Sequence, residues 1–136
     1  MEIEYTSNPK HEEINYLTNQ LSQSVEGVPF LRPFAFFIKS KDKQIKAGVN
    51  GFLIYGAIYT DQLWVSPQYR KQGLGSQLMK EVHQLGYSEN CAIATVATMS
   101  FSGARKFYEK LGYVVEFVRS GYKHTACCIY LIKKLL

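Results

Sequence analysis

The stretch R-K-Q-G-L-G, residues 70–75, lies between a run typical of a β-strand, L-W-V-S, and a run typical of an amphipathic helix, S-Q-L-M-K-E-V-H-Q-L-G. A turn at this position leaves main-chain N–H groups at the start of the helix without intrahelical partners. The helix dipole favours anions there, and glycine lets a phosphate approach the main chain without a Cβ in the way. Arg70 and Lys71 add mobile positive charge. The turn therefore indicates a phosphate-binding site in an α/β domain.

Two familiar phosphate-binding motifs do not fit this turn. The Walker A pattern requires lysine and then serine or threonine after its last glycine, whereas Gly75 is followed by Ser76 and Gln77. The dinucleotide fingerprint requires a third glycine where this chain has Leu78, and an acidic residue about 20 positions further on that closes a βαβ unit. Neither is present, and a G-x-G alone is also compatible with a purely structural turn.

Hydrophobic periodicity predicts the element order β-α-β-β-β-α-β-α-β-β, an α/β domain with a mixed sheet. Asn8 before Pro9 predicts the start of the first helix, and Gly86 predicts the end of the second. The proline- and glycine-containing segment 26–33 is expected to break the first helix. In chain order we expect strand 1–7, a helix from residue 8, strands 34–40, 45–55 and 57–66, a helix from residue 74, strand 91–98, helix 102–112, and strands 113–120 and 125–135.

Length and composition favour one globular domain over residues 1–136, since 46% hydrophobic residues can build a substantial core. The net charge of +5 favours a solvated, positively biased surface over nucleic-acid binding, because the basic residues are spread along the chain. No cleavable signal opens the sequence, and the longest apolar stretch is too short to span a bilayer. Three cysteines without a C-x-x-C motif fit a reducing cytoplasm.

Two motifs together make the sequence resemble a known family. R-K-Q-G-L-G-S-Q-L resembles the Arg/Gln-x-x-Gly-x-Gly/Ala pyrophosphate motif of the GNAT superfamily of N-acetyltransferases, and A-R-K-F-Y-E-K-L-G-Y is similar to that family's late helix, F-Y-x-K-x-G-F/Y. With the strand L-W-V-S-P-Q-Y-R, the resemblance covers residues 61–113. It implies a single-domain, mixed but mostly antiparallel sheet with a splayed parallel strand pair and flanking helices. It also implies direct transfer of an acetyl group from acetyl-CoA to a primary amine of a small molecule or peptide.

The resemblance implies where acetyl-CoA, the expected co-substrate, binds. It would lie between strands 57–66 and 91–98, with its pyrophosphate on the N–H groups of residues 72–76 and its pantetheine arm along Leu63 and Val65. The Val65 N–H could polarise the thioester carbonyl. Many family members carry an asparagine where this chain has Phe101, so Ser102 could take over a cofactor contact. No metal is expected. The expected cofactor-binding residues are Leu63, Val65, Arg70, Lys71, Gln72, Gly73, Leu74, Gly75, Ser76 and Ser102.

The resemblance also implies the catalytic groups. Tyr108 aligns with the family's tyrosine that protonates the departing CoA thiolate. Helical spacing independently predicts that its side chain points inward. The alternative is that Tyr108 is an ordinary core tyrosine. Asp61 is the candidate base that takes the proton of the amine, and the alternative is a hydrogen-bonding aspartate at a strand edge. His124, with an ordinary pKa near 6.5, is the second candidate base. The cysteines lie in apolar runs, where thiols are unreactive, so no acetyl-enzyme is expected.

The acceptor is the least constrained part of the sequence. In this architecture the segments 27–34 and 119–125 would surround it, and their aromatic and basic residues favour a small, partly apolar or anionic-tailed amine. We expect no membrane or nucleic-acid partner, and a monomer or a homodimer. The main alternative is a CoA-binding sensor or interaction domain without catalysis, which Phe101 favours and Tyr108 disfavours. A basic nucleic-acid-binding module would instead show affinity that falls steeply with salt.

Overall fold

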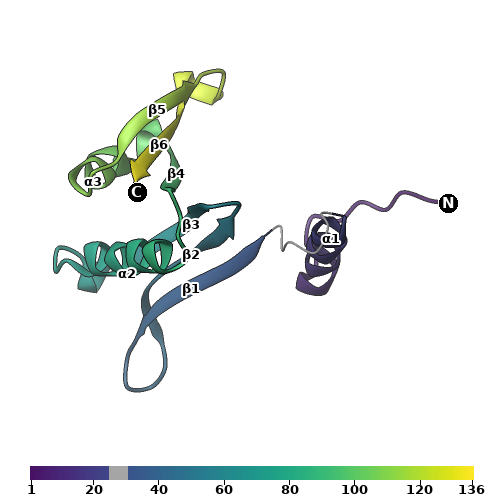
Figure 1. Ribbon diagram of the computed structural model, residues 1–136, viewed down its shortest axis with the longest axis horizontal. Coiled ribbons are helices and arrows are strands. Elements are labelled where there is room, and N and C mark those ends of the chain that lie inside the picture. Colours follow the sequence, from purple (N-terminus) through teal and green to yellow (C-terminus); the bar gives the residue numbers. More distant parts are fainter. Residues whose placement is uncertain (25–30) are drawn as a thin grey trace. The chain divides into compact units, whose positions relative to one another are not determined.

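The computed structural model describes residues 1–24 and 31–136, which form two units, Met1–Arg32 and Pro33–Leu136. In the first unit, helix α1 spans His11–Gln23 and carries acidic residues in its first turn, as the dipole favours (Figure 1). Its N-cap is Lys10, not Asn8, whose N–H bonds Thr6 Oγ1 at 3.0 Å. The predicted strand 1–7 is wrong: a strand needs a hydrogen-bonded neighbour, and the described part of this unit contains no other strand. The predicted helix-breaking segment lies mostly outside the described residues.

The second unit contains a six-stranded sheet in the order β1-β2-β3-β4-β6-β5 (Figure 1). Only β3 and β4 pair in parallel; β2 with β3, β4 with β6, and β5 with β6 are antiparallel. This confirms the predicted mixed α/β fold, whereas one domain over residues 1–136 stays a prediction. The strands are β1 (Arg32–Lys39), β2 (Ile45–Ile54), β3 (Ala57–Val65), β4 (Ile93–Met99), β5 (Val114–Arg119) and β6 (Cys128–Lys134), and the helices are α2 (Leu74–Ser88) and α3 (Ala104–Lys110).

Helix α2 contributes Leu78, Met79 and Val82 to a core shared with alternate residues of the central strands. Gly86 was expected to end this helix, but the helix continues to Ser88 and Gly86 is buried inside it. A Cβ at Gly86 would lie 2.8 Å from Leu135 Cδ1 and 3.0 Å from Ile58 Cγ2. Glycine is therefore required there by the close approach of the helix to β3 and the C-terminal residues, not by a turn.

The two parallel strands separate after four residue pairs. β3 and β4 pair from Ala57 with Ile93 to Thr60 with Val96, and the register stops there. At the same point β3 has a bulge, since Gly51 faces Thr60 and Asn50 faces Gln62, which leaves Asp61 without a partner residue in β2. A Cβ at Gly51 would collide with the carbonyl oxygen of Tyr59, so only glycine fits opposite the bulge. The sheet therefore opens between β3 and β4 from residue 61 onward, as the sequence predicted.

No helix in the described residues is both long enough and apolar enough to cross a bilayer.

Candidate active site

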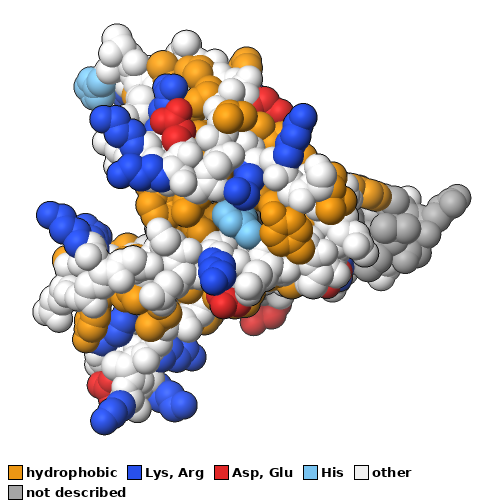
Figure 2. Space-filling view, turned by 60° about the vertical axis from the view of Figure 1, so that its left-hand side comes forward, with side chains coloured by type: hydrophobic (Ala, Val, Ile, Leu, Met, Phe, Trp, Pro, Cys, Tyr) orange, Lys and Arg blue, Asp and Glu red, His pale blue; other side chains and the backbone are white. Residues whose placement is uncertain are grey.

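A cleft of about 460 Å³ lies where β3 ends and α2 begins. It contains eight of the ten residues that the sequence predicted to bind the cofactor; Gln72 and Ser102 do not line it. Figure 2 shows the molecule hollowed between the part that carries α3 and β5 and the part that carries α2, with Lys and Arg side chains on both sides. The predicted residues that line the cleft are Leu63, Val65, Arg70, Lys71, Gly73, Leu74, Gly75 and Ser76.

The start of α2 presents main-chain donors to this cleft. Its N-cap, Gly73, has a left-handed φ of 79°, and no side chain caps the helix. The first intrahelical bond runs from the Gln77 N–H to the Gly73 carbonyl at 3.0 Å, so the preceding N–H groups have no acceptor within the helix. By contrast, the start of α3 has the Ser102 hydroxyl, which accepts the Ala104 N–H at 3.2 Å. Of these two helix starts, the one in the cleft is therefore open to an external anion, as a phosphate-binding turn requires.

The two basic residues of the turn are placed differently from one another. Arg70 Nε donates to the Val65 carbonyl at 2.9 Å, which holds its guanidinium against the end of β3. Lys71 has a φ of 63°, a left-handed conformation uncommon outside glycine, and also lines the cleft. The sequence predicted mobile charge at both positions, whereas the structure anchors Arg70 by a hydrogen bond.

Tyr108 is directed into the protein, as its helical spacing predicted. It is 5% exposed and packs edge-on against Phe107 and Tyr113, with ring centroids 5.1 and 5.5 Å away. Burial raises the pKa of Tyr108 to about 12. The phenol therefore keeps its proton at neutral pH, the state that a general acid needs before it donates.

A part-buried histidine–tyrosine pair lies beside Tyr108. His83 Nε2 and the Tyr113 hydroxyl are 2.8 Å apart, and Tyr113 is 2% exposed. Burial, and after it the nearby charge of Lys133, lowers the pKa of His83 from 6.5 to about 4. Burial and then Tyr108 raise the pKa of Tyr113. At neutral pH both partners are uncharged and share one hydrogen bond, which fixes the ring against which Tyr108 packs.

This pair predicts a loss of stability in acid. The unfolded chain protonates His83 near pH 6.5 while the folded chain resists until about pH 4, so stability falls as pH decreases through that window. Allowing for partial exposure of the ring, we expect a loss of about 1–2 kcal/mol in the free energy of unfolding. Urea unfolding at pH 7 and pH 4.5 measures it. His83→Gln should flatten the difference, and an equal pH dependence in both proteins would contradict the assignment.

The candidate bases lie outside the cleft lining. Asp61 is exposed at the β3 bulge, and its charge is the second cause, after burial, of the raised pKa of Tyr59. Asp61 is therefore close to Tyr59, at the point where β3 and β4 part. His124 has a left-handed φ of 57° and lines a separate hollow with Phe101 and Tyr122. This arrangement favours Asp61 over His124 as the group near the opening, and the role of each stays a prediction.

Neither Ser102 nor Phe101 lines the cleft. The Ser102 hydroxyl donates to the Met99 carbonyl at 2.9 Å, lies 2.7 Å from Thr98 Oγ1 and accepts the Ala104 N–H at 3.2 Å. Phe101 is 78% exposed. The Ser102 hydroxyl thus already has several partners, so a cofactor contact there would have to replace one of them.

Sequence reasoning missed three aromatic residues that line the cleft: Trp64, Tyr69 and Phe107. Phe107 belongs to the F-Y-E-K-L-G-Y motif, but that motif was used only to assign a role to its neighbour Tyr108. Trp64 lies within the predicted pantetheine strand, between Leu63 and Val65, but the bulge that sets the direction of its side chain is not visible in the sequence.

Residues 32–115 match the family described as acetyltransferase (GNAT) domain, which is most of the chain. The chain therefore belongs to the GNAT acetyltransferase family. The resemblance seen in the motifs is confirmed.

Individual relatives agree with this assignment. A thialysine N-epsilon-acetyltransferase of Bos taurus is 32% identical over 56 residues, which cover 40% of this chain and 33% of that protein. The match thus spans about a third of that relative's length. A protein of Agrobacterium tumefaciens, assigned as an acetyltransferase, has the same fold with a TM-score of 0.80 at 20% identity, covering 98% of this chain and 99% of that one.

One further structure contains the predicted cofactor. A protein of Bacillus anthracis str. Ames, assigned as a streptothricin acetyltransferase, is in complex with acetyl coenzyme A. Its TM-score is 0.68 at 21% identity, covering 75% of this chain and 62% of that one. At this identity the likeness concerns the fold.

Proposed function

We propose that this protein is an acetyl-CoA-dependent N-acetyltransferase that transfers the acetyl group directly to a primary amine of a small molecule or peptide. The observation that carries the proposal is the cleft at the uncapped start of α2, which is lined by the end of β3 beyond its last pair with β4 and has Arg70 and Lys71 on its wall. The relative named as a thialysine N-epsilon-acetyltransferase supports an amine nitrogen as acceptor. We expect a cytoplasmic monomer or homodimer.

The residues of the cleft fit acetyl-CoA. The N–H groups at the start of α2 and the charges of Arg70 and Lys71 would hold the pyrophosphate. Beyond Thr60 the register between β3 and β4 stops, so the β3 edge at residues 61–65 is open to main-chain bonding by the pantetheine arm. Acetyl-CoA supplies an acetyl thioester, whose carbonyl the Val65 N–H would polarise.

The chemistry requires two proton movements. The neutral amine nitrogen forms a bond to the acetyl carbon, the carbon–sulfur bond breaks, and the thiolate takes a proton from Tyr108. The amine loses one proton, which Asp61 would accept directly or through water. The products are the N-acetyl amide and the free thiol of CoA. No cysteine is needed, since Cys91 and Cys128 are buried.

A thermal-shift titration tests cofactor binding first. Acetyl-CoA and CoA at about 100 times their dissociation constant should stabilise the folded protein by about 2.7 kcal/mol, because they bind only the folded state. ATP and NAD should give no comparable shift, since the turn lacks their motifs. The absence of a shift with acetyl-CoA and CoA, in a folded sample, would remove the basis for the proposal.

Turnover separates an enzyme from the alternative, a CoA-binding sensor or interaction domain. Release of the CoA thiol in the presence of a panel of primary amines, followed with a thiol reagent, measures it. Amine-dependent release supports the enzyme, and binding without release for every amine supports the sensor.

A further inference from the structure

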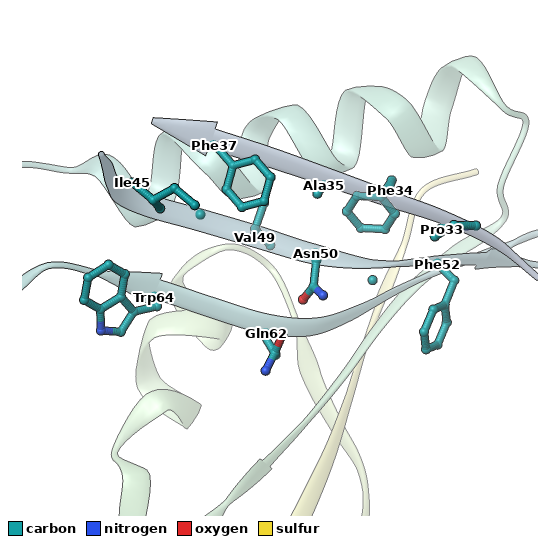
Figure 3. Close-up of a pocket in the computed structure, with 12 residues that line it drawn as sticks. Pro33, Phe34, Ala35, Phe37, Ile45, Val49, Asn50, Phe52, Gln62 and Trp64 are labelled. Atoms are coloured by element: carbon teal, nitrogen blue, oxygen red, sulfur yellow. The ribbon is translucent and has the colours of Figure 1, made fainter. Parts of the chain in front are cut away.

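A second, larger hollow of about 850 Å³ lies on β1, β2 and β3. We call it the aromatic groove and define it by Phe34, Phe37, Phe52, Trp64, Asn50 and Gln62 (Figure 3). Trp64 and Gln62 alternate along β3 with Leu63 and Val65, which pack against the core. Gln62 and Trp64 are therefore on the sheet face opposite the one that α2 covers, whereas Phe34 at the edge of the groove packs against the core. The groove is distinct from the cofactor cleft.

The middle of the groove contains an unsatisfied polar atom. Asn50 Oδ1 is buried and has no hydrogen-bond partner within the described part of the chain. Asn50 is paired in register with Gln62, and Figure 3 shows their amide ends between Trp64 on one side and Phe52 on the other. A buried acceptor without a partner costs about 1–3 kcal/mol. If the Asn50 side chain turns its Oδ1 toward the groove, a ligand N–H group donated to that oxygen would recover the cost.

The charge of the groove restricts what can bind. None of the described residues that line it is Lys, Arg, His, Asp or Glu. A carboxylate or phosphate between Asn50, Gln62 and Trp64 would find no counter-charge in the lining, since the Lys39 ammonium lies at the rim, 5.7 Å from the Phe37 ring centroid. A polycation would find no acidic partner in the lining, since Asp61 lies outside it, beside Tyr59. Aromatic rings, by contrast, favour a flat apolar body and attract an ammonium group.

The groove is adjacent to the cofactor cleft and to the surroundings of the candidate base, Asp61. Trp64 lines the groove and also the cofactor cleft. At the other end, Phe52 stacks on Tyr59 with centroids 5.3 Å apart, and the charge of Asp61 acts on Tyr59. The groove thus extends from the cofactor cleft at Trp64 to the neighbourhood of the candidate base at Phe52 and Tyr59.

From these observations we propose that the aromatic groove is the acceptor site, and that its substrate is a primary amine on a flat, apolar body without an acidic group. The proposal rests on the N-acetyltransferase function and specifies its substrate class. It differs from the sequence-based expectation, which also admitted an anionic tail and placed the acceptor at segments 27–34 and 119–125.

Trp64 provides a direct test, because it is the only tryptophan of the chain and all tryptophan fluorescence comes from the rim of the groove. 2-Phenylethylamine should change the emission saturably in the presence of CoA. n-Butylamine, 3-phenylpropionate and L-phenylalanine, which lack the ring, lack the amine or add a carboxylate, should each bind at least about 10-fold more weakly. The same order is expected in kcat/KM for the amines with acetyl-CoA.

Substitutions locate the site. Asn50→Leu, which keeps the number and branching of the heavy atoms but removes the acceptor, should weaken 2-phenylethylamine binding about 10-fold and leave acetyl-CoA affinity unchanged. Gln84→Leu, which also replaces a side-chain amide by leucine but on the exposed side of α2, is the control and should leave both affinities unchanged. Equal affinities for 2-phenylethylamine and L-phenylalanine, or no effect of Asn50→Leu, would overturn the proposal.

A separate titration with acetyl-CoA alone, measured by thermal shift, distinguishes failure of the acceptor-site proposal from failure of the N-acetyltransferase proposal. If acetyl-CoA binds but 2-phenylethylamine leaves Trp64 unaffected, the acceptor assignment is wrong and the N-acetyltransferase function stands. If acetyl-CoA itself fails to bind, the proposed function is wrong.

Discussion

Tyr108→Phe is expected to lower kcat by about 10²–10⁴-fold, the usual contribution of a general acid. The change removes only the hydroxyl, so the ring keeps its edge-on packing against Phe107 and Tyr113. Acetyl-CoA affinity and thermal stability should therefore remain close to those of the unsubstituted protein. Because burial raises the pKa of Tyr108 to about 12, the native hydroxyl keeps its proton over the pH range of an ordinary assay. The substitution therefore removes a proton that the native protein has available to donate.

Tyr113→Phe is the matched control for this prediction. It removes a hydroxyl from the neighbouring ring and breaks the 2.8 Å hydrogen bond to His83. We expect it to lower stability, since one partner of a buried hydrogen bond is left unpaired, and to have a far smaller effect on kcat. Steady-state kinetics and thermal melts of both variants make the comparison. A kcat for Tyr108→Phe within about threefold of the native value would show that another group protonates the thiolate.

Gly75→Val is expected to weaken acetyl-CoA binding by about 10–100-fold, equivalent to overpacking of about 1–3 kcal/mol. A Cβ at Gly75 lies 3.4 Å from the Phe107 ring and 4.0 Å from Val65 Cγ2, and both residues line the cleft. The two methyl groups that valine adds beyond the Cβ would therefore crowd residues that line the cleft. Calorimetric titration with acetyl-CoA measures the effect.

Gly75→Ala separates steric exclusion from a damaged helix. Its single Cβ is at contact distance, and alanine favours a helix by about 1 kcal/mol over glycine, so this variant should be at least as stable and bind within a few-fold of the native affinity. If Gly75→Val also binds within about threefold, the pyrophosphate does not lie over this turn.

The sequence predicted those parts of the fold that depend on local patterning. The hairpin of β1 and β2, the buried strand β4, and the α2 and α3 helices follow from alternation, helical spacing and turn residues. The cofactor turn was visible because its glycines and charges are contiguous, and Tyr108 because its neighbours at helical spacing are apolar.

Features that depend on contacts across the sheet could not be predicted in the same way. Gly86 has the sequence signature of a helix end, and only the approach of Leu135 and Ile58 shows why it is glycine. The strand predicted at residues 1–7 has an alternating pattern, but pairing is not a property of one segment. The aromatic groove combines residues of three strands, whose facing depends on the bulge at Asp61.

That bulge also sets the phase of the strand. Before it, Ile58 and Thr60 are the buried residues of β3; after it, the core-facing residues are Leu63 and Val65, so the alternation changes from even to odd numbers. A strand of the same composition without the extra residue would turn Trp64 toward α2 and Leu63 toward the open face. Asp61 therefore acts through its backbone as a one-residue spacer, independently of its carboxylate. A family member with a different side chain at this position can keep both binding surfaces. A family member that lacks the residue would instead reverse which side chains of the following strand face α2 and which face the groove.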